Sequence, residues 1–333
     1  MKNRFTGALA IGLFTLVAGT ANAQWKPEKP ITIIVPWAAG GSTDQVTRVA
    51  ASEIEKALNQ KVIIVNQPGA SGSIGTRNVL SGPPDGYTWA SGGAKDLGTY
   101  AVLGMVDTKI TDWELFLTVV NVSTLSVPAS SPYKTARVLI DAMRAKPGQI
   151  SVGSAGVNSS GHSAIEAITR AANVTYKHVT YDGGNPAVIA TVAGETDVTA
   201  QLTSEQAEML RGKRLRALAV VSDRPLELEG VGTIEPITKT LPNFKEPPNY
   251  FGIFIPKTVP PEVIATMQRI WKDQFANSAA MKTYAQRAGA QFAPAAGAEA
   301  LKLVMPAVQT NAWLAFDGGK AKVSPDTLGI ARP

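Results

Sequence analysis

The chain has 333 residues, of which 44% are hydrophobic and only 17% charged, and it contains no cysteine. This composition excludes a disordered chain, and the lack of cysteine excludes disulfides, thiol nucleophiles and cysteine metal sites. With only two histidines and no calcium-type loop spacing, we expect no metal and no cofactor. The net charge of +6 is spread without basic blocks between aromatics. It therefore suits a small anionic ligand and does not indicate nucleic acid.

Residues 1–23 have the pattern of an export signal. The chain starts with the basic residues Lys2 and Arg4, continues with an apolar run over 8–18, and reaches a small-residue cleavage motif that ends at Ala23. The apolar run is short for a membrane span, and no later stretch approaches the ~20 apolar residues that a span requires. We therefore expect an exported protein that is cleaved after Ala23 and is not embedded in a membrane.

Strands and helices alternate along the rest of the chain. Residues 31–35 form an apolar β-branched run that predicts a buried strand, and apolar residues within 46–58 fall on one helical face. A second strand is predicted at 62–65, which completes a β-α-β unit of the kind found in parallel sheets. A second alternating set runs from about 125 to 221. A strand at 250–255 and further helices follow it.

This pattern predicts an α/β fold with two lobes. If the chain leaves the first lobe near 125–129 and returns near 250–256, two extended connections join the lobes in the manner of a hinged clamp. Each lobe would be a mostly parallel sheet flanked by helices. Such sheets bind ligands at the carboxyl ends of their strands, so we expect a ligand cleft between the lobes.

Loops rich in glycine and small polar residues follow the predicted strands. Five of them lie at carboxyl ends, at 36–44, 68–75, 91–93, 154–161 and 181–185. In the first loop, Ser42 or Thr43 would cap a helix whose free N–H groups favour an anion, and Asp44 would complement the helix dipole. A single loop of this kind fits an ordinary tight turn, but five indicate a site made of backbone amides and hydroxyls.

The sequence gives little support to catalysis. It contains no Gly-x-Ser-x-Gly elbow, no phosphate-binding loop and no His-Glu-x-x-His motif. A serine hydrolase that uses Ser73 or Ser154 with His162 is the remaining enzymatic alternative. His162 itself fits either a group that orients a ligand carboxylate or an ordinary polar residue in a first helical turn. His178, in a predicted strand, fits a structural role.

Other polar and aromatic residues near these loops also have two interpretations. Lys95 could pair with an anion or remain solvated at the surface, and Trp37 could wall the ligand or belong to the core. The segment Thr203-Ser204-Glu205-Gln206 could line the cleft, although the pair Thr203 and Gln206 also fits a capping box.

Several short segments match one known family in order along nearly the whole chain. They are Lys29 to Asp44, Val65 to Gly75, Pro84 to Thr88, Ser154 to His162, Tyr181 to Ala187 with Gly194 and Asp197, Leu218 to Val220, and Phe251 to Pro256. At these segments the sequence resembles the substrate-binding proteins of tripartite tricarboxylate transporters, the TctC or Bug family.

The resemblance implies a periplasmic binding protein with a Venus-flytrap motion. Domain 1 would comprise residues 24–126 and 251–333, and domain 2 residues 127–250. The ligand would be a small di- or tricarboxylate, delivered to an inner-membrane permease of the same family, and we expect a monomer without enzymatic activity. A receptor that reports its ligand to a sensor kinase is the alternative within the same fold.

In this interpretation backbone amides of residues 40–42 would hold one carboxylate, and the 156–160 loop would close on the other side. Specificity would come from Ser71, Ser73, Lys95, Thr203 and Ser204. The full set of expected ligand-binding residues is Trp37, Ala39, Gly40, Gly41, Ser42, Asp44, Ser71, Ser73, Gly92, Lys95, Ser154, Gly156, Asn158, Ser159, Ser160, His162, Tyr181, Gly183, Thr203 and Ser204.

Overall fold

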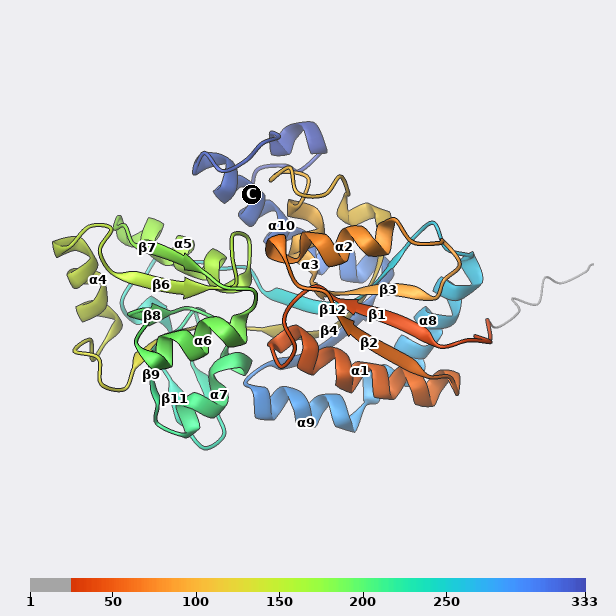
Figure 1. The fold of residues 1–333 in the computed structure, drawn as a ribbon, viewed down its shortest axis with the longest axis horizontal. Helices are drawn as coiled ribbons and strands as arrows, with labels where there is room; N and C mark the ends of the chain where they lie inside the picture. The colour runs from red at the N-terminus through yellow and green to blue at the C-terminus, as the bar shows by residue number, and fades with distance from the viewer. Residues whose placement is uncertain (1–24) are drawn as a thin grey trace, which may run out of the picture.

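A computed structural model describes residues 25–333, so the predicted export signal at 1–23 lies outside the described residues. Two α/β lobes lie side by side, each around its own sheet (Figure 1). The first lobe holds a six-stranded sheet in the order β13-β4-β12-β3-β1-β2, and the second a five-stranded sheet in the order β7-β6-β8-β5-β9. No helix in the described part of the chain is both long and apolar enough to cross a membrane.

The first lobe is built from both ends of the described chain. Its strands are β1 (Ile31–Val35), β2 (Val62–Asn66), β3 (Thr88–Gly93), β4 (Trp113–Asn121), β12 (Asn249–Pro256) and β13 (Gln291–Ala296). Its helices are α1 (Ser42–Leu58), α2 (Ser73–Leu80), α3 (Ala94–Thr99), α8 (Pro261–Asp273), α9 (Ala279–Ala288) and α10 (Gly297–Asp317).

The second lobe comes from the middle of the chain. Its strands are β5 (Thr124–Pro128), β6 (Ser151–Ser154), β7 (Lys177–Thr180), β8 (Val198–Thr199) and β9 (Leu215–Val220), with a short antiparallel ribbon of β10 (Leu226–Leu228) and β11 (Gly232–Ile234). Its helices are α4 (Ala136–Ala145), α5 (Ser160–Ala172), α6 (Gly184–Ala193) and α7 (Thr203–Arg211).

Both sheets are mixed, so their parallel part is smaller than expected. Strand β1 runs parallel to β2 and β3, and β6 runs parallel to β7 and β8. Strands β12 and β5, in contrast, pair antiparallel with both of their neighbours. Strands β1, β2, β6 and β7 end in glycine-rich loops, where the crossover to the next element starts. The prediction of a loop at 91–93 is wrong, because these residues are the end of β3.

The two connections between the lobes run next to each other. Strand β4 ends at Asn121, and the chain enters the five-stranded sheet at Thr124, slightly before the expected boundary at 127. It returns at the start of β12, where Asn249 pairs with Asn121. Adjacent crossings of this kind give two bodies a common axis about which they can rotate.

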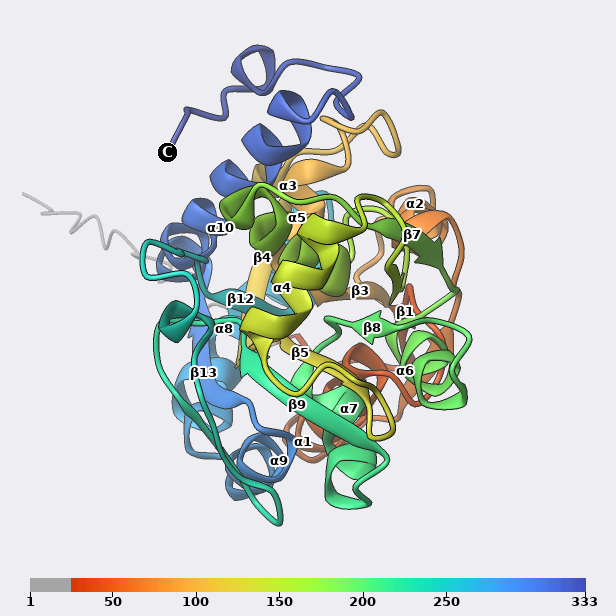
Figure 2. The ribbon, with the colours of Figure 1, turned by 90° about the vertical axis from the view of Figure 1, so that its left-hand side faces the viewer.

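Two hydrophobic layers cover the faces of the six-stranded sheet. On one face α8 and α9 pack with α1, and the Trp271 ring stacks on Phe275 at 3.8 Å between centroids. On the other face α10 packs against α3, where Gly98 leaves room for Val308. The C-terminal helices therefore build the first lobe and form no third unit. Seen from the second lobe, α10 lies beside α5 of that lobe (Figure 2).

Candidate functional site

The first turn of α1 faces the second lobe, and its cap differs from the prediction. The N-cap is Gly41, without a side-chain cap, and neither Ser42 nor Thr43 takes that role. Both residues lie inside the helix, at its first two positions, and the Ser42 hydroxyl is engaged elsewhere. It accepts hydrogen bonds from Asn121 Nδ2 at 3.0 Å and from Ser204 Oγ, in the second lobe, at 2.8 Å.

A carboxylate of the protein approaches this helix terminus. The Ser42 backbone N–H donates to Glu205 Oε1 at 3.2 Å. When its amide is oriented to satisfy both neighbours, Gln201 donates to Glu205 Oε2 at 3.2 Å and accepts from the Ala155 N–H at 2.7 Å. Burial raises the pKa of Glu205 to about 7. Glu205 stands in the segment 203–206 that was expected to line the cleft, although it was not among the expected ligand-binding residues.

The loop after β6 reaches across the cleft to α3. Asn158, at φ +72°, accepts a hydrogen bond from Lys95 Nζ on its backbone oxygen at 2.6 Å and donates from Nδ2 to Thr99 Oγ1 at 2.9 Å. Lys95 is only 2% exposed and also pairs with Asp96 at 2.9 Å. The solvated-surface interpretation of Lys95 is therefore wrong, because its ammonium group links the two lobes.

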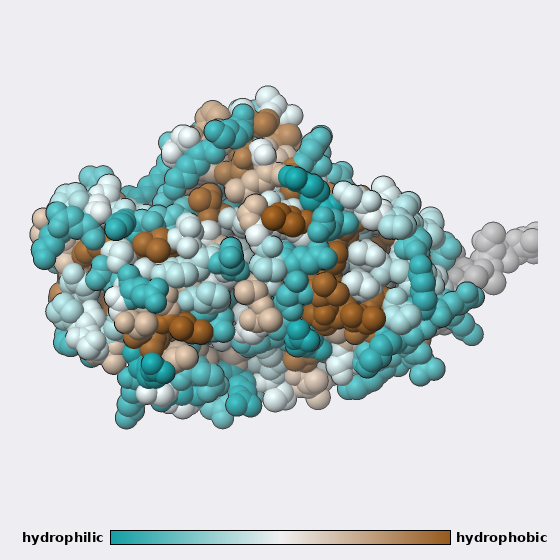
Figure 3. Space-filling view, viewed as in Figure 1, coloured by the Kyte–Doolittle hydropathy of each residue, from teal (hydrophilic) through white to brown (hydrophobic). Residues whose placement is uncertain are grey.

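The loops after β2 and β6 also touch directly. Ser71, at φ +56°, faces Gly156 so closely that a side-chain carbon on Gly156 would lie 2.6 Å from Ser71 Oγ. Trp37 is half-buried, with its ring against Gly72. In the space-filling view, side chains fill the boundary between the lobes (Figure 3). These loops are thus in the closed arrangement.

The N-terminus of α5 completes this side of the cleft. Ser159 is its N-cap and accepts from the His162 N–H at 3.3 Å, while Ser160 Oγ accepts from Asn249 Nδ2 at 2.8 Å. Both side chains are therefore tied to backbone or hinge groups that fix the loop.

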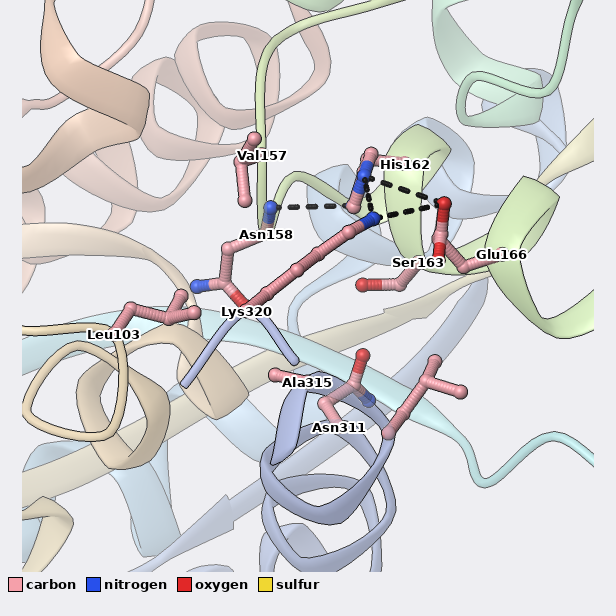
Figure 4. Close-up of a pocket in the computed structure, with 10 residues that line it drawn as sticks. Leu103, Val157, Asn158, His162, Ser163, Glu166, Asn311, Ala315 and Lys320 are labelled. Atoms are coloured by element: carbon pink, nitrogen blue, oxygen red, sulfur yellow. Dashed lines mark hydrogen bonds and ion pairs between the residues drawn. The ribbon is translucent and has the colours of Figure 1, made fainter. Parts of the chain in front are cut away.

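His162 lies in a small pocket between α5 and the segment after α10 (Figure 4). Lys320 Nζ is 3.4 Å from His162 Nε2 and 3.0 Å from Glu166 Oε1. Burial, together with the charges of His178 and Lys320, lowers the pKa of His162 to about 3, so its ring is neutral here. A second ion pair between the lobes, Arg170 with Asp317 at 3.1 Å, lies farther along α5.

Four expected residues use their side chains within their own lobe. Asp44 pairs with Arg48 at 2.8 Å, and the Tyr181 hydroxyl donates to Glu195 at 3.4 Å. Thr203 Oγ1 donates to the Val122 carbonyl at 3.0 Å. The predicted capping box of Thr203 and Gln206 is wrong, because the N-cap of α7 is Leu202 and Gln206 donates to the carbonyls of Thr124 and Gln201.

Ser154, the fourth of these residues, pairs with a histidine other than the expected one. Its buried hydroxyl lies 2.6 Å from His178 Nε2 and accepts from the Gly156 N–H at 3.1 Å. The hydrolase alternative pairs Ser154 with His162, whereas the structure pairs it with His178.

Of the remaining expected residues, some lie at the cleft and others lie inside the first lobe. Ala39 and Gly40 are exposed at the loop tip, where Gly40 faces Asn185, and Gly183 faces Ala38 from the second lobe. Ser73 is the buried first residue of α2, and Gly92 pairs with Gly252 inside the sheet.

A larger cavity of about 710 Å³ lies between the lobes at the two crossings. Among the expected site residues, only Lys95 and Ser160 line it, together with Asn121, Glu246 and Asn249. The buried Asn249 Oδ1 has no hydrogen-bond partner there, and burial raises the pKa of Glu246 to about 7. The volume is within the range of small-molecule sites.

The fold matches known binding proteins. It aligns with the periplasmic binding protein BugD at a TM-score of 0.78, with 23% identity, over 89% of this chain and 99% of the other. It also aligns with MatC from Rhodopseudomonas palustris, solved with bound malate, at a TM-score of 0.77, with 22% identity, over 86% and 99% of the two chains. These matches confirm the expected two-lobed α/β fold class.

The sequence matches a family as well. It is 33% identical over 268 residues to a protein encoded in the tcbD–tcbE intergenic region of Pseudomonas sp. strain P51, covering 79% of each chain. Residues 46–309 match the family model described as the tripartite tricarboxylate transporter family receptor, TctC. The chain therefore belongs to this family of receptors, as its motifs predict, and is a solute-binding receptor and not an enzyme.

Proposed function

We propose that this protein binds a small di- or tricarboxylate between its two lobes and delivers it to the inner-membrane permease of a tripartite transporter. One observation carries the ligand class. The Ser42 N–H at the start of α1 already donates a hydrogen bond to a carboxylate oxygen from across the cleft, namely Glu205 Oε1 at 3.2 Å. The malate bound to the structurally similar MatC supports the same chemistry.

In this proposal residues 24–126 with 251–333 and residues 127–250 move as two bodies about the paired crossings at Asn121 and Asn249. Amides of Gly40, Gly41 and Ser42 hold one carboxylate. The second lobe closes on the ligand with Gly156, Asn158, Ser159, Ser160, Gly183 and Ser204. The side chains of Ser71 and Lys95 contribute to selectivity from the first lobe.

Because the loops touch in the closed arrangement, the ligand must enter while the lobes are apart. The cost of separating the contacts at Ser42 and Ser204, and at Lys95 and Asn158, is then offset when the ligand replaces them. We further propose that the protein acts in the periplasm as a monomer, after cleavage of its signal peptide behind Ala23.

The test is a thermal shift experiment on residues 24–333, refolded from denaturant to remove any co-purified ligand. Mono-, di- and tricarboxylates are compared at equal ionic strength. A ligand that binds only the folded state raises the melting temperature by mass action, so at least one di- or tricarboxylate should raise it by several degrees. Equal, small shifts for all acids would contradict the proposal.

A further inference from the structure

Glu205 projects from the first turn of α7 towards the first lobe. One carboxylate oxygen accepts from the Ser42 N–H at 3.2 Å, and the other accepts from the Gln201 side chain at 3.2 Å. Ser42 is the first residue of α1, where free N–H groups and the helix dipole favour an anion. A single N–H cannot serve two carboxylates well. Glu205 therefore occupies the position that the proposed function assigns to the ligand.

The backbone around Glu205 leaves space for its carboxylate and little else. Any side chain on Gly184, the first residue of α6, would overlap both carboxylate oxygens. A side-chain carbon on Gly41 would already lie 3.4 Å from Oε1. Glu205 is thus held between the N-termini of one helix from each lobe, and this placement depends on glycine at 184.

No basic side chain neutralises this carboxylate. Within residues 25–333, Glu205 forms no ion pair. The titratable group that faces it from α9 is Tyr284, whose pKa is raised by burial and by the charge of Glu205. From α1 and α6 it meets only backbone, and from the turn before α7 the neutral Gln201. A structural ion pair therefore does not explain the position of Glu205.

We propose that Glu205 is a built-in competitor of the ligand, whose carboxylate fills the α1 anion position of the empty receptor and yields it only when Glu205 withdraws or becomes protonated. This inference rests on the proposed function. An anionic ligand beside Glu205 disfavours its charged form, so ligand binding and proton uptake by Glu205 favour each other. Affinity should then rise as the pH falls through about 7, the value to which burial raises the pKa of Glu205.

The test is calorimetric titration of the mature protein with malate and with adipate at pH 6, 7 and 8. For whichever acid binds, the affinity of the wild-type protein should increase about ten-fold from pH 8 to pH 6. An increase of this size corresponds to the uptake of one proton per bound ligand over part of that pH range. Glu205→Gln and Glu205→Ala should bind at least five-fold more tightly than wild type at pH 8 and lose this pH dependence. The matched control is Glu208→Gln, an exposed residue on the same helix, and it should behave as wild type. Weaker binding by both Glu205 variants, or an unchanged pH dependence, would overturn the proposal.

A second measurement needs no ligand. In wild-type protein the amide proton shift of Ser42 should titrate with a midpoint near pH 7, because the charge on its acceptor changes, and this titration should vanish in Glu205→Gln. If neither acid binds to any variant but the titration is observed, the ligand class is wrong while Glu205 still occupies the α1 position. If the Ser42 shift stays flat between pH 6 and 8 in wild type, Glu205 does not hold that position and the inference fails.

Discussion

The hydroxyls of Ser42 and Ser204 lie 2.8 Å apart although they belong to different lobes. Each residue stands in the first turn of a helix, so this contact brings the N-termini of α1 and α7 together. A ligand held between these termini must separate the two hydroxyls. Residues at the boundary between the lobes can therefore form the binding surface or hold the lobes together, and substitutions distinguish these two roles.

Gly41→Val tests the placement of the anion at α1. Gly41 has an ordinary φ of −74°, so valine causes no backbone strain, but its side chain would project towards Glu205 and fill the approach to the Ser42 amide. We expect at least ten-fold weaker carboxylate binding in calorimetry and a melting temperature close to that of wild type. Gly82→Val is the control, because its neighbours are carbonyl oxygens at 3.4 and 3.5 Å and it lies outside the cleft. Equal affinities for wild type and Gly41→Val would refute the placement.

Lys320→Ala tests the contact between α5 and the segment after α10. Lys320 bridges to Glu166 at 3.0 Å in the closed arrangement, and its side chain is 39% exposed. A partly exposed pair contributes roughly 0.5–1 kcal/mol, so losing it should favour the open lobes and weaken ligand binding two- to five-fold. Lys302→Ala, on the exposed side of α10, should leave affinity unchanged. A similar loss in both variants, or none in Lys320→Ala, would contradict this role.

His162→Asn tests the acid sensitivity of the fold. The pKa of His162 is lowered to about 3 in the folded protein, whereas the unfolded chain binds a proton near the ordinary value of about 6.5. Above pH 6.5 His162 is neutral in both the folded and the unfolded chain, so it does not affect the free energy of unfolding. Below pH 6.5 only the unfolded chain takes up the proton, and the free energy of unfolding falls by about 1.4 kcal/mol per pH unit. Urea unfolding at pH 7, 5.5 and 4.5 should show a steeper decline for wild type than for the variant. Parallel declines would assign the acid sensitivity to other groups.

Gly98→Ala tests the packing of α10 on the first lobe. A side-chain carbon at 98 would lie 2.5 Å from Val308 Cγ1, which overpacks the interface of α3 and α10 and should cost about 1–3 kcal/mol of unfolding free energy. Val308→Ala removes the opposing methyl groups, so the double variant should lose less than the sum of the two single losses in urea unfolding. Strictly additive losses would show that the two residues do not meet.

Local patterns predicted most of the parallel strands. The apolar runs at 31–35 and 62–65 became β1 and β2, because β-branched residues favour strands. Strand β1 is buried as expected, but β2 lies at the edge of the sheet and only Val62 of its residues is buried. No strand is predicted at 113–121, yet β4 lies there with all nine residues buried. The apolar, β-branched run from Leu115 to Val120 is a local signal for a buried strand that was overlooked. Its pairing with β12 and β13, which are far away in the sequence, could not be predicted locally.

Strand β13 was missed for a different reason. It contains Pro294, which normally argues against a strand. The strand is tolerated because it lies at the edge of the sheet and its register shifts between Phe292 and Ala295, so that the proline falls within an irregularity.

At the candidate site, too, the local sequence predicted the loops but not the contacts between distant segments. Four of the five glycine-rich loops were recognisable, because each follows a strand and is rich in glycine and hydroxyl residues, whereas residues 91–93 are the end of β3 itself. The partners that close the cleft were not. Ser42 meets Glu205 across 163 residues of sequence, and His162 meets Lys320 across 158. Such pairs follow from how the lobes face each other, which no local pattern reports.

The most direct test of the central claim is a calorimetric titration of the refolded mature protein with dicarboxylic acids of four to six carbons and citric acid, each compared with its uncharged amide. At least one acid should bind with a micromolar or lower Kd, and its amide should not bind detectably. Binding of the amide as tight as that of the acid, or no binding of any acid, would contradict a receptor built to hold carboxylates.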